Sequence, residues 1–370
     1  MRINFFFLTA QHKINTITAT QIIKLFFIHE RKVYIMKKLL FVITLTAILA
    51  VSASMSLAAP ELTLIIASNA TDLANPYSHG LDKFKEVAEE VSGGKIQVTV
   101  HKGTLGENES ELIEKLTMGA ADIVVSSPGF MTAIGVPEID IFSLEYLFDS
   151  FAHWEKCLDG EFGEAMKKIV LDKTYNQFRV VGYWSSSVRD VYAKKPVKSP
   201  ADLKGLSIRT QSSQVQQEFF KNCGAIPTTV AWGELYQALQ QGVVDGAEND
   251  YTNITLKEHH KTPNGKYISE THHDFTTRLF LMNGDRYDKL TDEQKEWIAK
   301  AAQASTAEER AVTYRMFGES KQKAIKDGAI ITEFADIDIK AFKEVAIPIQ
   351  DDFAKRNNMT EQLNMIRAAE

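Results

Sequence analysis

The stretch 198-KSPADLKGLSIRTQSSQVQQEFFKNCG-224 carries the local pattern that decides the fold. After a turn and a single helical turn, residues 206–210 alternate as a short strand. A helix over 214–224 follows and ends at Gly224. Arg209 therefore lies at the carboxyl end of a strand, just before a loop and a helix. Open α/β sheets bind their ligands at this position.

The flanking segments extend this unit on both sides. Upstream, 178-FRVVGYWSSSVRDVYA-193 predicts two short strands, rich in Val, Tyr and Trp, that are broken by three serines. This segment places a second arginine, Arg189, twenty positions before Arg209. Downstream, the run 241-QGVVDGAEND-250 carries Asn249 near its end. We therefore expect the functional residues to gather in this part of the chain.

From Pro60 onward, the chain alternates strands with helices. The expected strands are 61–68, 95–103 and 121–129, and the expected helices between them are 81–94 and 110–119. This order, with short connections, predicts a parallel sheet with helices on both faces. Another helix is expected over 151–170. A capping box at 291-TDEQ-294 begins a helix that runs past about thirty residues, which indicates that it bridges two lobes.

The first 58 residues do not have the pattern of this fold. A positive start at Met36, an apolar run over 39–51 and small residues after it predict a secretory signal peptide over 36–58. An uncleaved membrane anchor is the alternative, because about twenty apolar residues can span a bilayer. We interpret residues 1–35 as a non-native segment upstream of the true start. A periplasmic protein is therefore expected.

Charge and motif content argue against several functions. The first 58 residues hold seven Lys or Arg and one Glu, a net charge of +6, so from a total of −6 the remainder carries −12. Such an acidic protein is not expected to bind nucleic acid or anionic membranes. The sequence contains no G-x-S-x-G, H-E-x-x-H, P-loop or G-x-G-x-x-G pattern. It therefore gives no indication of an enzyme.

The cysteines and histidines do not define a site. Cys157 and Cys223 could pair after export, but each fits a small buried side chain better. The histidine pairs at 259–260 and 272–273 could in principle converge on zinc. Adjacent histidines point in different directions, so neither pair chelates a metal by itself. We expect no metal ion and no cofactor.

Four blocks of the chain occur in a fixed order: 93-GGKIQVTVHKGTLGENESELIEKLTMGAADIV-124, 137-PEIDIFSLEYLF-148, 196-PVKSPADLKGLSIRT-210 and 233-GELYQALQQGVVDGAEND-250. In order and spacing, across residues 60–345, they resemble the solute receptors of tripartite ATP-independent periplasmic (TRAP) transporters, the C4-dicarboxylate-receptor-like family. The resemblance implies a two-lobed α/β periplasmic binding protein with discontinuous lobes and a hinge. Such a receptor closes over an acidic solute and delivers it to the membrane subunits of a TRAP permease.

The same resemblance implies the residues of the binding site. Arg209 would hold the solute carboxylate in a bidentate salt bridge, because a guanidinium makes two parallel N–H···O bonds that a lysine cannot reproduce. The other implied residues are Arg189, Asn249, Trp232, Asn69, Asn75, Ser127, Glu109 and Glu111. Whether Glu109 or Glu111 faces the ligand is left open. Asn249 can exchange hydrogen bonds with a hydroxyl group, and Trp232 supplies an apolar wall.

These groups favour a sugar acid, such as a uronate or an aldonate, as the ligand. A C4-dicarboxylate such as malate or succinate is an alternative, because it would also use two arginines. An exported lyase or hydrolase of sugar acids is the alternative from another class. We expect a monomer that is not an enzyme. The resemblance and the long helix predict one lobe from 60–183 with 275–310, and another from 184–274 with 311–370.

Overall fold

The computed structural model describes residues 31, 34, 36–41, 59–106 and 108–369. The chain divides into two units, Met1–Ala59 and Pro60–Glu370. Apart from a few helical residues, the predicted signal peptide (36–58) and the segment 1–35 lie outside the described residues. In the described part of the chain, no helix is both long and apolar enough to span a bilayer. The fold below is that of the second unit.

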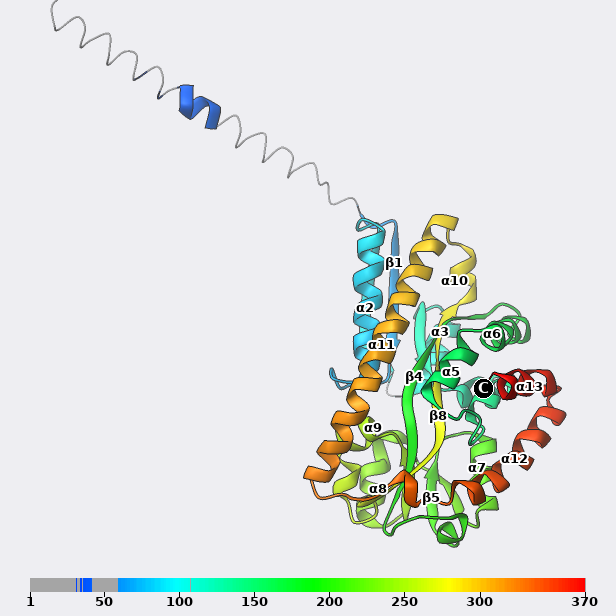
Figure 1. Ribbon diagram of the computed structural model, residues 1–370. Coiled ribbons are helices and arrows are strands. Elements are labelled where there is room, and N and C mark those ends of the chain that lie inside the picture. Colours follow the sequence, from blue (N-terminus) through cyan, green and yellow to red (C-terminus); the bar gives the residue numbers. More distant parts are fainter. Residues whose placement is uncertain (1–30, 32–33, 35, 42–58, 107, 370) are drawn as a thin grey trace, which may run out of the picture. The chain divides into compact units, whose positions relative to one another are not determined.

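One mixed sheet organises this unit (Figure 1). Its strands in the described residues are β1 (Leu62–Ser68), β2 (Ile96–Lys102), β3 (Ile123–Ser126), β4 (Phe178–Ala193), β5 (Ser207–Thr210), β6 (Ile226–Thr229), β7 (Gly246–Asn249), β8 (Tyr267–Asn283) and β9 (Ile330–Thr332). The order is β2-β1-β3-β8-β4-β7-β5-β6, with β9 beside β8. β1 pairs in parallel with β2 and β3, as predicted, and β5 pairs in parallel with β6 and β7. The long strands β4 and β8 are antiparallel and join the two sets.

The prediction of two short strands over 178–193 is wrong, because β4 is continuous through its serines. Ser187 adopts a left-handed conformation with φ of 64°, and the pairing with β8 shifts register between Ser185 and Val188. A β-bulge of this kind bends a strand without ending it. The Ser185 hydroxyl accepts a hydrogen bond from the Ser187 backbone N–H at 3.0 Å. The serines therefore mark a bend in the sheet rather than a loop.

Helices α2 (Pro76–Val91) and α11 (Asp292–Lys326) cover one face of the sheet (Figure 1). Phe84 of α2, Phe280 of β8 and Ile298 of α11 belong to one buried apolar cluster on this face. The prediction of a long helix is confirmed, since α11 has 35 residues and begins with the Thr291–Gln294 capping box. Along its length α11 packs against α2, β4 and α9 (Tyr251–Leu256). It therefore connects both strand sets.

The opposite face and the strand ends carry the other helices of the described residues. They are α3 (Glu109–Thr117), α4 (Pro128–Ala133), α5 (Phe151–Leu158), α6 (Glu161–Lys173), α7 (Gln214–Asn222), α8 (Leu235–Gln241), α10 (Gly284–Asp288), α12 (Ile339–Arg356) and α13 (Thr360–Ala368). Short 3₁₀ segments are η1 (Pro137–Ser143), η2 (Pro200–Leu203), η3 (Trp232–Glu234), η4 (His259–Lys261) and η5 (Phe334–Asp336). The predicted single helix over 151–170 is wrong, because the chain turns at Asp159 and Gly160 between α5 and α6. At Gly163 an added Cβ would lie 1.9 Å from the Leu158 carbonyl oxygen, so this turn requires glycine.

Candidate functional site

The two sets of parallel strands end beside the middle of β4 and β8. β3 ends where it pairs with Leu279 of β8, and β7 ends where Asn249 pairs with Asp190 of β4. The stretch of β8 from Asp274 to Arg278 lies between these points. Open α/β sheets bind ligands outside the carboxyl ends of their strands. The candidate site is therefore where these strand ends meet.

Arg209 on β5 is a buried cation without an acidic partner. Its side chain is 7% exposed, and its Nε donates to the Val230 carbonyl oxygen at 3.1 Å. The guanidinium carbon lies 5.9 Å from the ring centre of Trp232. No carboxylate in the described part of the chain forms an ion pair with it, and burial lowers the pKa of its guanidinium. A desolvated charge of this kind needs a counter-charge, so Arg209 is suited to bind an anion.

Arg189 on β4 is also completely buried, but its charge is already neutralised. It donates from Nε and Nη2 to the two carboxylate oxygens of Glu248, at 2.8 Å for the Nη2 contact. Nη1 donates to Oδ1 of Asn249 at 2.9 Å. With its amide oxygen turned toward Arg189, Gln211 accepts from Nη1 and Nη2 at 3.0 and 3.2 Å. Arg189 therefore pairs with an acid on β7, and Asp190 instead accepts from the His272 backbone N–H at 3.0 Å.

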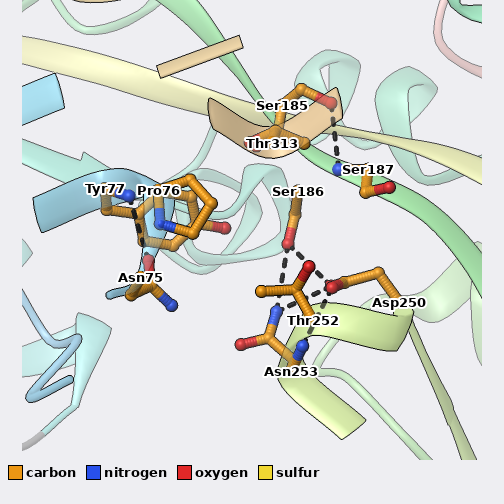
Figure 2. A pocket seen from close by; sticks show the side chains of 10 residues that line it. All are labelled: Asn75, Pro76, Tyr77, Ser185, Ser186, Ser187, Asp250, Thr252, Asn253 and Thr313. Atoms are coloured by element: carbon orange, nitrogen blue, oxygen red, sulfur yellow. Dashed lines mark hydrogen bonds between the residues drawn. The ribbon is translucent and has the colours of Figure 1, made fainter. Parts of the chain in front are cut away.

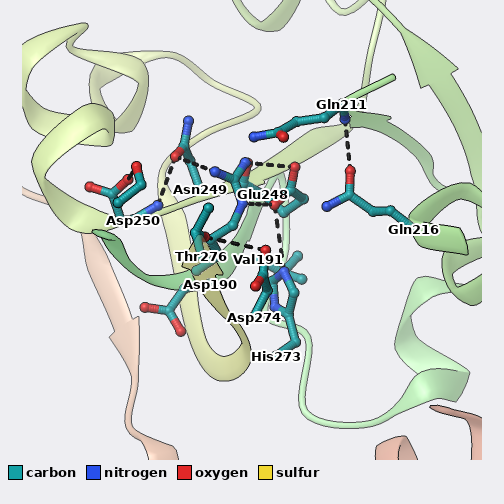
Figure 3. A network of polar contacts seen from close by, with 12 residues as sticks. Asp190, Val191, Gln211, Gln216, Glu248, Asn249, Asp250, His273, Asp274 and Thr276 are labelled. Carbon is teal, nitrogen blue, oxygen red and sulfur yellow. Dashed lines mark hydrogen bonds and ion pairs between the residues drawn. The ribbon is translucent and has the colours of Figure 1, made fainter. Parts of the chain in front are cut away.

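Figure 3 shows Glu248 and Asp274 in this polar network. These buried acids, together with Glu145, differ in the pKa of their carboxyl groups. Burial alone would raise the pKa of Glu248, but attraction to Arg189 and contact with His273 lower it to about 2. Burial raises the pKa of Asp274 to about 7, and burial with repulsion from Asp274 and Glu248 raises the pKa of Glu145 well above its usual range. Near neutral pH, the Arg189 cation and the Glu248 anion cancel. The positive charge of Arg209 remains uncompensated.

Asn249 and Trp232 provide further groups for a ligand. Oδ1 of Asn249 accepts from Arg189 and from the Asp250 backbone N–H at 3.0 Å. Its Nδ2 amide has no acceptor among the described residues, and so it is a fixed donor. Trp232, in η3, is half-buried and meets His259 edge-on with 5.2 Å between the ring centres. Its ring offers an apolar surface next to Arg209.

On the other strand set, Glu109 lies at the candidate site. It opens α3, and its Oε2 accepts from the backbone N–H of Ser127, at the end of β3, at 2.5 Å. Glu111 instead accepts from the Asn108 side chain at 2.8 Å, as part of the N-terminal cap of the same helix. Of the two glutamates, Glu109 is therefore the one held at a strand end. Ser127 contributes its backbone N–H to this contact.

Asn75 and Asn69 follow β1. The helix predicted to begin at residue 81 begins at Pro76, because Asn75 caps it by accepting from the Tyr77 backbone N–H at 3.0 Å. Asn75 also lines a small cavity with Tyr77, Ser186, Asp250 and Asn253, among others (Figure 2). In it Ser186 and Asn253 both donate to Asp250. Neither Arg209 nor Arg189 lines this cavity, so it is not the site of the uncompensated charge. Asn69 is half-buried directly after β1.

Arg278 of β8 was not among the site residues predicted from the sequence. This side chain is 6% exposed. Nε donates to the Tyr77 hydroxyl at 3.0 Å and Nη1 to the Thr277 carbonyl at 3.3 Å. Within the described ranges no carboxylate forms an ion pair with it. An arginine directly before the apolar run 279-LFLM-282 was a visible signal, because a charged residue at a buried position of a strand needs a reason.

The predicted histidine pairs do not converge. His259 hydrogen-bonds through Nδ1 to Tyr192 at 2.9 Å, and His260 contacts Asp327 at 3.1 Å. His272 stacks on Phe334, at 4.6 Å between ring centres. In the described part of the chain, no group of three or more His, Cys, Asp or Glu side chains could hold a metal ion. Cys157 and Cys223 are free, buried thiols, and burial raises their pKa values to about 11 and about 12.

Comparison with known proteins gives consistent matches. Residues 67–357 match the DctP family model, described as bacterial extracellular solute-binding protein, family 7. The C4-dicarboxylate-binding periplasmic protein DctP of Rhodobacter capsulatus is 28% identical over 86% of this chain and 96% of its own. A TRAP periplasmic solute-binding protein from Sulfitobacter, solved with β-D-galacturonate, has a TM-score of 0.76 and 30% identity, covering 83% of this chain and 99% of its own. One from Roseobacter denitrificans, solved with β-D-glucuronate, has a TM-score of 0.77 and 26% identity, covering 83% and 100%. The fold is that of two-lobed TRAP solute-binding proteins.

Proposed function

Because this chain belongs to family 7 of the bacterial extracellular solute-binding proteins, we propose that it is a periplasmic receptor for a sugar acid. In this proposal it binds a uronate or an aldonate and delivers it, chemically unchanged, to the membrane subunits of a TRAP permease. The receptor is not an enzyme and acts as a monomer. Residues 36–58 direct its export as a signal peptide.

The observation that carries the proposal is the buried, unpaired guanidinium of Arg209. An organic acid enclosed in a cleft loses its hydration, and its charge then needs a matched counter-charge. The planar fork of Arg209 supplies two parallel N–H donors for one carboxylate. Its Nε is already fixed by Val230, so the fork is oriented before the ligand arrives, which reduces the entropic cost of binding.

The surrounding groups support a hydroxylated ligand. Nδ2 of Asn249 donates to a ligand oxygen, and Glu109 accepts from a ligand hydroxyl at the opposite strand end. Trp232 covers one face of the sugar ring or carbon chain. Arg189 acts mainly through Asn249: its Nη1 donates to Oδ1 of Asn249 at 2.9 Å and so orients the amide. Asn69 and Ser127 close the site from the side of β1 and β3, Asn75 holds the first turn of α2, and Glu111 keeps the end of α3 folded.

Ligand capture requires the two strand sets to close on each other. We assign 60–183 with 275–310 to one lobe and 184–274 with 311–370 to the other. β4, β8 and α11 cross between these lobes, and the bulge at Ser187 gives β4 a bend where a hinge is needed. Closure is then a rotation of two rigid bodies about this bend, and the ligand shifts the balance toward the closed form.

A binding panel tests this function. The purified protein is heated with glucuronate, galacturonate, gluconate, malate or succinate, and NMR follows each acid during incubation. We expect a six-carbon sugar acid to raise Tm and to stay unchanged, because a ligand that binds only the folded state stabilises it. Stabilisation by malate or succinate alone would move the assignment to a C4-dicarboxylate receptor. No stabilisation by any acid, or conversion of one, would overturn the proposal.

A further inference from the structure

Arg278 is a second buried cation with no role so far. Within the described residues, four arginines are buried: Arg189, Arg209, Arg278 and Arg310. Arg189 pairs with Glu248, and Arg310 makes two bonds to the carboxylate of Asp159 at 2.7 and 2.9 Å. Among the described residues, Arg209 and Arg278 donate hydrogen bonds only to carbonyl and hydroxyl oxygens. The fold thus neutralises two of its buried arginines and leaves two without a partner.

The two unpaired arginines come from opposite strand sets. Arg209 lies on β5 and pairs with Ala247 of β7. Arg278 lies on β8 opposite Trp184, one residue before Leu279, which pairs with the last residue of β3. Arg278 is therefore at the end of β3, where Glu109 is also held. A ligand between the strand ends has one guanidinium on each side.

The local structure holds Arg278 in place rather than neutralising it. Its bond to the Tyr77 hydroxyl ties it to the first turn of α2. Burial lowers the pKa of this guanidinium, and Tyr77, Glu109 and Asp274 raise it. An arginine side chain stays charged in a protein in any case. Nη2 has no acceptor among the described residues. A charged guanidinium that is held in one orientation, with Nη2 free to donate, is suited to bind an anion.

We propose that Arg278 binds a second acidic group of the ligand, so that the receptor prefers a dicarboxylic sugar acid over the corresponding uronate or aldonate. One carboxylate lies on Arg209 and the other on Arg278, and the hydroxylated chain between them contacts Asn249 and Glu109. Two carboxylates supply both missing counter-charges, whereas a monocarboxylate leaves one guanidinium buried without a partner. This inference rests on the proposed receptor function for sugar acids, and within that class uronates and aldonates would bind more weakly than the diacid.

The test compares three acids with one carbon skeleton: galactarate has a carboxylate at both ends, galactonate has one at a single end, and galacturonate has one at a single end with its aldehyde end closed into a ring. Calorimetry on the purified protein is expected to show galactarate binding about tenfold more tightly, or better, than either monoacid. In Arg278→Gln we expect galactarate affinity to fall by about 30-fold or more, while the monoacids change little. Arg315→Gln, on the exposed surface of α11, is the control for charge loss and is expected to change nothing.

Each result decides the inference. A monoacid that binds more tightly than galactarate would overturn it, as would an equal loss for all three acids in Arg278→Gln. Malate or succinate binding more tightly than galactarate would overturn the sugar-diacid class. If Arg278→Gln does not fold, Arg278→Lys replaces it, because lysine keeps the charge but lacks the paired N–H donors of the guanidinium. The relative affinities of the unaltered protein for the three acids remain decisive in either case. Failure of every acid to bind would instead overturn the receptor function itself.

Discussion

Arg189 of β4 donates to both carboxylate oxygens of Glu248 on β7, and both side chains are completely buried. This ion pair joins the central strand to the strand that carries Asn249. It also explains why one conspicuous arginine in the sequence is structural in its contacts, whereas Arg209 is free of any acid.

Replacing Glu248 with Gln leaves the Arg189 charge buried without a partner. Breaking a buried pair in this way typically costs about 3–5 kcal/mol, so we expect a loss of that order in the free energy of unfolding, measured by urea denaturation. Glu248→Gln at neutral pH is compared with Glu344→Gln, on the exposed face of α12. Equal stability of the two variants would contradict the account of this ion pair.

Glu248 also makes stability depend on acid pH. Its pKa is lowered from 4.5 to about 2 in the folded protein, so the unfolded chain binds its proton first as the pH falls. The stability from this group is therefore complete above about pH 4.5 and is lost as the pH falls toward about 2. Between these two pH values, Tm should change more steeply with pH for the unaltered protein than for Glu248→Gln. Identical pH slopes would contradict this prediction.

Glu309 of α11 is expected to act in the opposite direction. It accepts from the Ser185 backbone N–H at 3.0 Å, and burial raises its pKa to about 8. The folded protein keeps a proton that the unfolded chain releases above about pH 4.5, so this contribution to stability is complete below that value and declines as the pH rises through about 8. Glu309→Gln removes this titration. Between about pH 5 and about pH 8, the free energy of unfolding of the unaltered protein should therefore fall relative to that of Glu309→Gln. A difference between the two proteins that stays constant over this range would contradict the prediction.

The turn between α5 and α6 gives a test of packing. Gly163→Ala places a methyl group 1.9 Å from the Leu158 carbonyl oxygen, and relieving this clash means moving backbone. We expect a destabilisation of a few kcal/mol, on the order of that seen for severe overpacking. Gly318→Ala is the matched control, because no atom lies near its new methyl group in α11, and it should stabilise by about 0.5–1 kcal/mol. Similar Tm values for the two variants would refute the close approach at Gly163.

The sequence revealed the parts of the fold that local chemistry determines. The capping box at Thr291 and the short strand that carries Arg209 depend on neighbours along the chain, and both predictions are confirmed. The strand break at the three serines is wrong because a long-range partner, β8, continues the pairing on both sides of a bulge. The single helix over 151–170 is wrong because the chain turns between α5 and α6, where Gly160 and Gly163 both lie against backbone carbonyl oxygens.

The candidate site was less predictable for the same reason. Arg209 was visible as an arginine at a strand end, but its lack of an acidic partner is a fact of tertiary packing. The partner of Arg189 lies 59 positions away in the sequence, and no local pattern identifies it. Arg278 is visible only as a charge in an apolar strand, and it gains meaning when β8 is placed beside the end of β3. The roles of the predicted site residues stay predictions until ligand binding is measured.

Calorimetric titration of Arg209→Ala with the best acid of the panel is the most direct test of the receptor function. Since loss of one partner of a buried pair costs about 3–5 kcal/mol, we expect affinity to fall by about two to four orders of magnitude. The Tm without ligand should change little, because Arg209 has no ion pair to lose, and Arg315→Ala should bind as the unaltered protein does. Retention of full affinity by Arg209→Ala would contradict the assignment of this arginine as the carboxylate anchor.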